Sequence, residues 1–337
     1  MKGAVTSKAT ALTRNRLNVI GVFAIALILV FLCSLYLGTF GTIGPAEWWS
    51  SQPDTSTKVV FDLRLPRFLV GAGVGAALAM SGAVLQTILR NPLAEPGVIG
   101  INAGAALSAS VALLLLEGNM PSQVLAFWSV FGACAAVALV VILSVTSSYV
   151  DPIRLILSGI AITSLCGALL TAVTLVGPTH RIQRLLSWLS GNLNGVDLKD
   201  AKLIWSCIAV CLPLLLLQAR RLDLMSLDRR THEALGAKAQ IPVLLLLFIA
   251  AVLAGVATAV AGILIFVGLV APHIARRLVG VPNRFVLPCS ALIGAVCVSS
   301  ADLLGRVALA PTQVPAGLLV SILGSPVLFY IMRQRND

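Results

Sequence analysis

Residues 71–86 read GAGVGAALAMSGAVLQ, and small side chains recur there at every fourth position: Gly71, Gly75, Ala79 and Ala83. Positions four apart share one face of an α-helix. In a lipid bilayer no hydrophobic force drives helices together, so stripes of small side chains let helix backbones approach closely. Two more stripes with this spacing are Gly100, Gly104 and Ser108, and Ala251, Gly255 and Ala259. The pattern predicts a tightly packed bundle of membrane helices.

Composition supports a lipid-embedded chain. Of the 337 residues, 58% are hydrophobic and only 11% are charged, far less charge than a water-facing surface carries. The net charge of +11 comes from lysines and arginines that lie between the apolar runs, as membrane topology requires. Because no basic patch interleaved with aromatic residues occurs, we expect membrane lipid, and no nucleic acid, as a partner.

About 20 apolar residues cross the hydrocarbon layer as a helix. On that measure the sequence predicts an all-α polytopic membrane protein with ten transmembrane helices, forming one domain over residues 1–337. The predicted spans are 17–38, 66–89, 98–117, 122–146, 153–176, 201–219, 242–264, 267–280, 286–306 and 313–332.

The charge distribution supports ten spans with both termini in the cytoplasm. Sixteen of the 24 basic residues then lie inside and eight outside, whereas fusing spans seven and eight gives twelve on each side. The positive-inside rule prefers the first arrangement, and a single helix over 241–275 would be far longer than the bilayer is thick. Residues 1–16 are expected to form a cytoplasmic tail, and the run after them is too long for a signal peptide.

Motifs for catalysis or metal binding do not occur. The sequence lacks the G-x-x-x-x-G-K-[ST] loop, so we expect no enzyme activity, no ATP hydrolysis by this chain and no cofactor. Cys207 and Cys211 share a helix face, but no further ligand residue lies near them, and we interpret the cysteines as small packing residues. The three histidines are scattered, which favours packing or interfacial roles.

Three polar stretches interrupt the apolar runs. Residues 90–100, RNPLAEPGVIG, contain Pro92 and Pro96, which prevent a continuous helix, so this stretch is either an ordinary tight hairpin or a functional elbow. Residues 220–241 form either a solvated loop or a rigid two-helix knob that docks a cytosolic partner. Residues 177–200 have an apolar side that predicts a short helix on the outer rim.

Charged residues inside the predicted spans are few. Asp302 and Arg306 lie one helical turn apart and either pair at the outer end of span nine or line a transport path. A proton-coupled carrier needs ionisable groups near the membrane midplane. Their scarcity argues against an ion-gradient-driven secondary transporter, which stays the alternative, as does a membrane receptor without transport.

Seven stretches of the sequence, in chain order, carry a resemblance to a known family. They are RLPR (64–67), RNPLAEPGVIGINAGA (90–105), GNLNGVD (191–197), SLDRRTHEALGA (226–237), FVGLVAPHIARRLVG (266–280), LPCSALIGAVCVSSADLLGR (287–306) and VPAGLLVSILGSPVLFYI (314–331). Together they resemble the FecCD family of permeases of bacterial ABC importers, from about residue 40 to the C-terminus.

The resemblance implies a type II ABC importer permease in the bacterial inner membrane that imports a ferric siderophore, haem or cobalamin. It implies a second permease subunit, identical or related, two copies of an ATP-binding subunit and a periplasmic substrate-binding protein. Residues 221–240 match the coupling helices of the family. The residues that this match assigns to the ATPase contact are Leu227, Asp228, Arg229, Arg230, Glu233, Leu235 and Gly236.

Two further sites follow from the same resemblance. Arg64, Arg67 and Arg306 match arginines that receive acidic residues of the binding protein, and the positive-inside count also places them outside. Asn91, Pro92 and Leu93 match the cytoplasmic gate, which favours the elbow over the plain hairpin. One departure is Gln313, where the family often carries an acidic residue.

Overall fold

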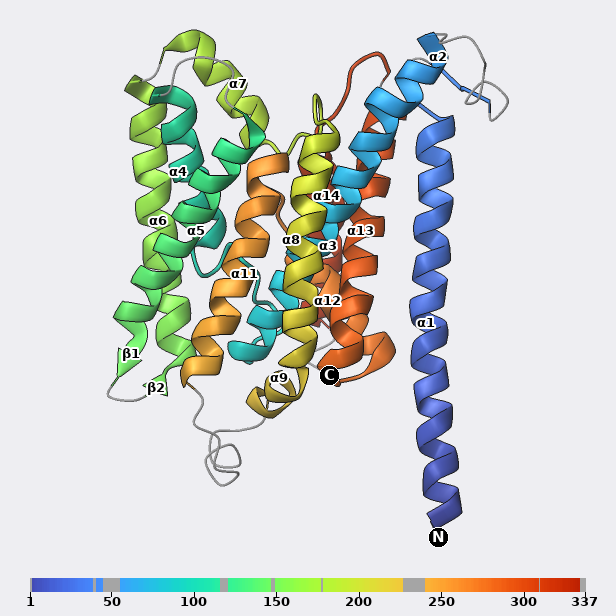
Figure 1. The fold of residues 1–337 in the computed structure, drawn as a ribbon. Helices are drawn as coiled ribbons and strands as arrows, with labels where there is room; N and C mark the ends of the chain where they lie inside the picture. The colour runs from blue at the N-terminus through green and yellow to red at the C-terminus, as the bar shows by residue number, and fades with distance from the viewer. Residues whose placement is uncertain are drawn as a thin grey trace.

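The computed structural model describes residues 2–38, 41–44, 55–115, 121–146, 149–176, 178–226, 240–308 and 310–333. These residues form one bundle of long helices (Figure 1), with a two-stranded antiparallel hairpin of β1 (Val145–Thr146) and β2 (Tyr149–Val150). The short helix α7 (Thr179–Leu189) lies at one end of the bundle and the short helix α9 (Ala219–Met225) at the other. We call these the α7 end and the α9 end.

Every predicted span coincides with a helix. The helices are α1 (Lys2–Tyr36), α3 (Leu65–Ile88), α4 (Ile101–Leu115), α5 (Ser122–Ser144), α6 (Pro152–Val176), α8 (Leu198–Leu217), α11 (Gln240–Ala261), α12 (Val267–Val279), α13 (Asn283–Val307) and α14 (Ala316–Arg333). Among the described residues, seven helices are long and apolar enough to cross a membrane, and Ile101–Leu114 and Ala316–Phe329 are shorter apolar helices. The all-helical membrane fold is therefore confirmed, while the count of ten crossings stays a prediction.

The predicted separation of spans seven and eight is confirmed. Helix α11 ends at Ala261 and α12 begins at Val267. Between them Gly262 and Phe266 both have positive φ, 74° and 72°, which a continuing helix cannot accommodate. The break leaves α12 only 13 residues long, with Arg276 and Arg277 in its last turn.

Helix α3 forms the centre of the bundle and packs against α13, α11 and α12. Its stripe of small residues meets backbone, as predicted: a Cβ atom at Gly75 would collide with the carbonyl group of Gly294 in α13. On the same helix, a Cβ at Gly82 would collide with the carbonyl group of Gly268 in α12. Glycine is needed at both places because the two backbones touch.

The other two predicted stripes also mark close helix pairs. Gly104 of α4 faces Gly132 of α5, where an added Cβ on either side would meet the opposite carbonyl group. Gly255 of α11 lies against Val130 of α5, whose Cα atom would be 3.0 Å from an added Cβ. These contacts hold α4, α5 and α11 together on one side of α3.

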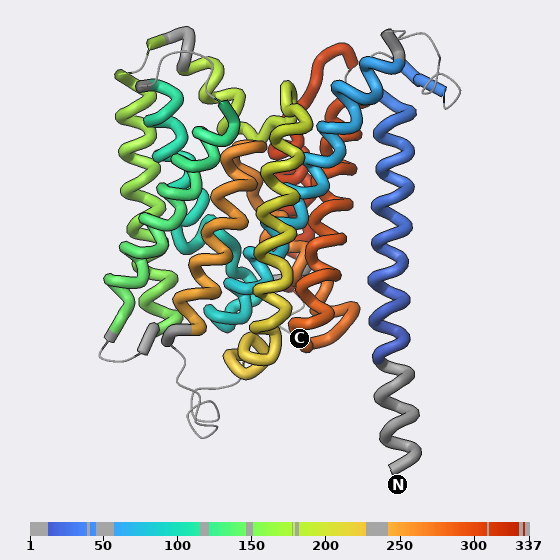
Figure 2. Tube along the Cα trace, in the orientation of Figure 1, coloured from blue at the N-terminus to red at the C-terminus, as the bar shows by residue number. Residues whose placement is uncertain are grey.

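Helix α1 lies at the edge of the bundle (Figure 2), where it packs mainly against α13 and places Phe31 against Phe68 of α3 at 4.9 Å between ring centroids. Helix α1 begins at Lys2, so residues 2–16 of the predicted cytoplasmic tail are helical. The rim helix predicted within 177–200 is α7. Its Leu185 is buried, and the indole nitrogen of Trp188 donates to the carbonyl oxygen of Ala259, 3.2 Å away.

Candidate functional site

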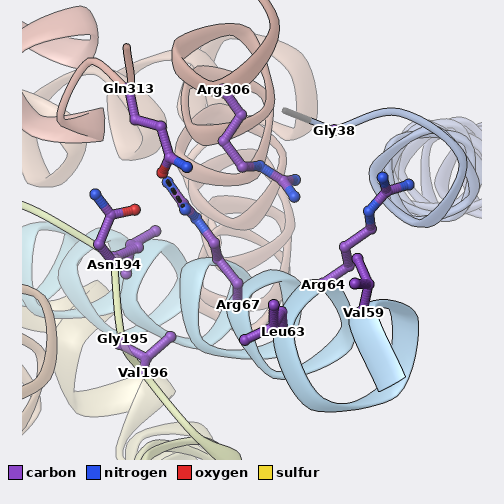
Figure 3. A pocket seen from close by; sticks show the side chains of 11 residues that line it. Gly38, Val59, Leu63, Arg64, Arg67, Asn194, Gly195, Val196, Arg306 and Gln313 are labelled. Atoms are coloured by element: carbon purple, nitrogen blue, oxygen red, sulfur yellow. Dashed lines mark hydrogen bonds between the residues drawn. The ribbon is translucent and has the colours of Figure 1, made fainter. Parts of the chain in front are cut away.

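Three arginines line one pocket of about 410 Å³ at the α7 end (Figure 3). Arg64 ends η2 (Val59–Arg64), a π-helical turn that follows α2 (Thr55–Lys58). Arg67 lies in the first turn of α3, and Arg306 lies in the last turn of α13. We call this the arginine pocket. The structure therefore brings together all three arginines that the family resemblance assigns to binding-protein docking.

A buried carboxylate lies between two of these arginines. Asp302, 2% exposed, accepts from Arg67 Nε at 2.8 and 3.0 Å, and its Oδ1 atom is 2.7 Å from Arg67 Nη2. The Oδ2 atom of Asp302 is also 3.2 Å from Arg306 Nε. The pairing of Asp302 with Arg306 confirms one of the two sequence-based interpretations and adds Arg67 as a third member.

Gln313, the departure from the family pattern, lies on the other side of Arg67. Its amide oxygen accepts from Arg67 Nη1 at 2.8 Å (Figure 3). An acidic residue here would add a second negative charge beside Arg67. With glutamine at this position, the described residues that line the pocket include three arginines and no carboxylate, and Asp302 beside them supplies one negative charge, so these residues keep a positive excess.

Two of the three guanidinium groups are turned into the protein. Arg64 is 3% exposed and donates to the backbone carbonyl oxygens of Leu35 at 2.7 Å, Tyr36 at 2.9 Å and Gly41 at 2.9 Å. Arg306 is 4% exposed and donates from Nη2 to Ser34 Oγ at 2.6 Å. Sequence reasoning missed these bonds because backbone carbonyl groups carry no sequence signal. Both arginines tie the C-terminal end of α1 to the bundle.

Replacing Arg64 by alanine is expected to lower the free energy of unfolding by about 2 kcal/mol, because hydrogen bonds to a charged group are lost and buried carbonyl oxygens lose their donor. Equilibrium unfolding of the purified protein in detergent measures the change. Lys58→Ala is the matched control, since Lys58 is exposed on the preceding helix. Equal stability of the two variants would contradict the structural role of Arg64.

The predicted gate residues lie in a compact turn at the α9 end. Asn91 accepts from the Leu93 backbone N–H through its side-chain oxygen at 3.0 Å, and the Ala94 N–H donates to the Asn91 carbonyl oxygen at 3.1 Å. Asn91, Pro92 and Leu93 are each partly exposed. We call residues 89–100 the elbow. Hydrogen bonds within its backbone hold the residues assigned to the gate in one defined turn.

The elbow is joined to two other helices. Glu95 Oε2 accepts from the backbone N–H of Phe266, the residue that precedes α12, at 3.1 Å. On the α6 side, Thr163 Oγ1 donates to the Gly97 carbonyl oxygen at 3.1 Å. Sequence reasoning missed Glu95 and Phe266, which are 171 positions apart. The elbow thus contacts α6 and α12 as well as its own flanking helices.

The residues assigned to ATPase coupling lie outside the described part of the chain. They are Leu227, Asp228, Arg229, Arg230, Glu233, Leu235 and Gly236. The described part of the 221–240 segment belongs to α9 and its C-cap, Ser226. Helix α9 directly follows α8 at the end of the bundle that also contains the elbow.

Cysteine and histidine positions give no metal site within the described ranges, where no cluster of three potential ligands occurs. The sulfur atoms of Cys207 and Cys211 are 3.9 Å apart on α8, as the shared face predicted. Cys211 is buried among core residues. These thiols pack against the bundle core.

Known proteins resemble this chain over nearly its whole length. The model of the FecCD transport family matches residues 26–334. The Fe(3+)-citrate import system permease protein YfmE of Bacillus subtilis (strain 168) is 38% identical over 275 residues, covering 82% of each chain. The hemin transport system permease protein HmuU of Yersinia pestis is 35% identical, covering 94% of this chain and 96% of the relative.

A solved structure has the same architecture. It is described as an inward-facing conformation of a putative metal-chelate type ABC transporter, and it matches with a TM-score of 0.84 and 29% sequence identity. The match covers 94% of this chain and 99% of the other. The order and packing of the helices therefore match those of this solved structure over almost the whole chain.

Proposed function

Since the chain belongs to the FecCD transport family, we propose that it moves a ferric siderophore, haem or cobalamin-type chelate across the bacterial inner membrane. It is a multi-pass membrane permease subunit of an ABC importer. The substrate class rests on relatives named for iron citrate, hemin and vitamin B12. In this proposal both termini are cytoplasmic, so the α7 end is outside and the α9 end is inside.

The observation that carries the proposal is the end-to-end structural match to a metal-chelate type transporter. The arginine pocket and the elbow add to it, because they lie at opposite ends of α3. An importer needs a receiving surface outside and a gate inside, and this bundle has a candidate for each.

A second permease subunit is proposed to cover the faces of α6 and α14. Helix α6 packs mainly against α4 and α5 and leaves Leu157 and Leu165 exposed. The hydroxyl groups of Ser164 and Thr171 are also exposed on α6, where they bond only backbone carbonyl groups of their own helix. Polar side chains avoid lipid. Their exposure supports a transport path between two subunits, lined mainly by α6 and α14.

The arginine pocket is proposed to receive acidic residues of a periplasmic substrate-binding protein. Arg67, Arg306 and Arg64 supply three positive charges against the one carboxylate of Asp302. Complementary charge orients a docking partner and speeds its encounter more than it adds affinity. Arg64 and Arg306 are buried, so in the described conformation they contribute to the electrostatic field of the pocket. Arg67 is the most accessible of the three arginines.

The elbow is proposed to be the cytoplasmic gate, with Asn91, Pro92 and Leu93 as its constricting residues. Pro92 and Pro96 exclude helix, and Gly100, at φ 80°, lets the chain turn directly into α4. A stiff turn between two packed helices converts a small tilt of either helix into movement of the turn. The side-chain bond of Asn91 to Leu93 supports that stiffness.

Transport is proposed to be driven by ATP hydrolysis in a pair of separate ATP-binding subunits, which bind residues 221–240. Charge reversal of Arg229 and Arg230 to glutamate is expected to reduce co-purification of the ATP-binding subunit by about tenfold or more, because like charges would face the partner. Quantitative immunoblotting of a pull-down on the tagged permease measures the loss. Arg333→Glu, at an exposed position in α14, is the control. Undiminished co-purification would contradict the coupling role of this segment.

An ion-gradient-driven secondary transporter is the alternative that the structure favours less. Asp302, the buried carboxylate of α13, pairs with Arg67 and Arg306 at one end of the bundle and not near its middle. Uphill uptake of haemin or a ferric chelate into vesicles by this chain alone would support the alternative and overturn the ATP-driven mechanism.

A further inference from the structure

Polar side chains from the elbow and from the helices α3, α9, α12 and α13 lie at the α9 end. We call this group the inner cluster; its members are Thr87, Arg90, Asp223, Arg276 and Asn283. In Figure 1, α9 lies close to the ends of α12 and α13 at this end of the bundle. None of these five residues lines the arginine pocket, and none is among the proposed constricting residues Asn91, Pro92 and Leu93.

Asp223 joins α9 to α13. One of its oxygens, Oδ1, accepts from both the backbone N–H and the side-chain Nδ2 of Asn283, each at 2.7 Å. Asn283 is the first residue of α13 and is fully buried. A carboxylate is favourable at the N-terminus of a helix, where backbone N–H groups are free. Asp223 therefore fixes α9 to the start of a core helix.

Arg276 extends the connection to α3. Its Nη2 atom donates to Thr87 Oγ1 at 2.7 Å and to the Ala83 carbonyl oxygen at 3.0 Å, and it lies 3.4 Å from Asn283 Oδ1. Thr87 is in the last turn of α3 and is buried. The Asp223 carboxylate attracts the same guanidinium group. Arg276 thus bonds α12 to the ends of α3 and α13, and Asn283 in turn bonds α13 to Asp223 of α9.

Arg90 makes the direct connection from the elbow to α9. Its Nε atom donates to the carbonyl oxygen of Met225, the last residue of α9, at 2.9 Å. Arg90 has a φ of 49°, in the left-handed region that residues other than glycine seldom adopt. Such a conformation persists where surrounding contacts determine it. A cation at a helix C-terminus is also favourable, so the positive charge of Arg90 stabilises the C-terminal end of α9.

We propose that the inner cluster is a mechanical relay, in which Arg90 and Asp223 act as positioning residues that make the elbow move with α9. The proposal rests on the proposed function, because α9 leads into the segment assigned to the ATPase. A displacement of α9 would reach the elbow through Arg90, and would reach α3 and α13 through Asp223 and Arg276. Without these bonds, the two segments would shift independently and ATP-driven motion would not reach the gate.

Hydrogen–deuterium exchange of the permease bound to its ATP-binding subunit tests the relay, with and without ATP plus vanadate. The elbow offers protected amides for this measurement, including those of Asn91, Ala94 and Val98. In the unmodified complex we expect trapping to change exchange in both 219–226 and 89–100. Arg90→Met should keep the change in 219–226 and reduce the change in 89–100 by about tenfold.

Three further variants separate the relay from general stability. Arg90→Lys can still donate to the Met225 carbonyl oxygen and should keep the elbow response. Asp223→Asn keeps one acceptor but loses the charge opposite Arg276, and should reduce the response less than Arg90→Met does. Arg220→Met is the matched control, because Arg220 is an exposed arginine on α9 that lies outside residues 221–240. It should behave like the unmodified chain.

The remaining outcomes decide between the relay and its alternatives. An unchanged elbow response in Arg90→Met would overturn the relay. Fast exchange of 89–100 in that variant without nucleotide would also overturn it, because Arg90 would then only hold the elbow folded. A nucleotide response in 219–226 but not in 89–100 of the unmodified complex would overturn the relay and leave the proposed function standing. No response in either segment of the unmodified complex would overturn both.

Discussion

Replacement of Gly82 by valine is expected to abolish the accumulation of folded protein. A Cβ atom at this position would overlap the carbonyl oxygen and carbon of Gly268, which belong to the backbone of α12. Neither backbone can withdraw without separating α3, which is almost entirely buried, from its neighbours. The expected penalty is at least about 3 kcal/mol, the upper part of the usual range for overpacking.

Size-exclusion chromatography of detergent-extracted protein, normalised to total expressed chain, measures this effect. Gly21→Val is the matched control, because Gly21 also lies inside a helix and nothing lies within 4 Å of an added Cβ there. Both substitutions change helix propensity in the same way, so a difference between them isolates the backbone contact. A normal monodisperse peak for Gly82→Val would show that α3 and α12 are not in contact as described.

Replacement of Asp302 by alanine is expected to destabilise the protein by about 3–5 kcal/mol. The carboxylate lies between Arg67 and Arg306 and is nearly inaccessible to solvent. Removing one partner of a buried ion pair leaves uncompensated buried charge, which costs much more than the pair itself contributes. Here a single deletion leaves two guanidinium groups without their shared carboxylate.

Equilibrium unfolding in mixed detergent measures the change in the free energy of unfolding. Asp62→Ala, at an exposed position in η2, is the control and should stay within about 0.5 kcal/mol of the unmodified protein. The triple variant Arg67→Leu, Asp302→Leu and Arg306→Met should recover much of the loss, because an apolar cluster of similar volume replaces a buried ion pair at little cost. A triple variant as unstable as Asp302→Ala would contradict this electrostatic account.

Those parts of the fold that depend on short-range pattern could be predicted from the sequence. The spacing of Gly71, Gly75, Ala79 and Ala83 predicts a close helix pair, and α3 meets α13 there. The inside–outside count of basic residues, which includes Arg276, predicts that spans seven and eight are separate. The structure has two helices there, α11 and α12. Helix ends were less predictable: α4 begins at Ile101, three residues after the predicted start, because Gly100 with positive φ terminates the elbow.

The candidate site could be predicted only in outline. Resemblance to a family brought Arg64, Arg67 and Arg306 together, but their partners depend on tertiary packing. Arg64 bonds carbonyl groups 23 to 29 positions away, and Arg67 bonds Asp302 across 235 positions. No local pattern encodes such distances. The coupling residues, from Leu227 to Gly236, lie outside the described residues and stay predictions.

The peripheral position of α1 has a consequence for how the protein is made. Helix α1 emerges from the ribosome first, yet its main neighbour, α13, is among the last segments to be synthesised. During most of translation α1 therefore lacks its main neighbour, and the mean hydropathy of 2.8 over Thr13–Tyr36 permits its exposed face to lie against lipid. The hydrogen bond from Arg306 to Ser34 Oγ can then form only when biosynthesis is nearly complete. The surface proposed to receive the binding protein is consequently absent from every unfinished chain.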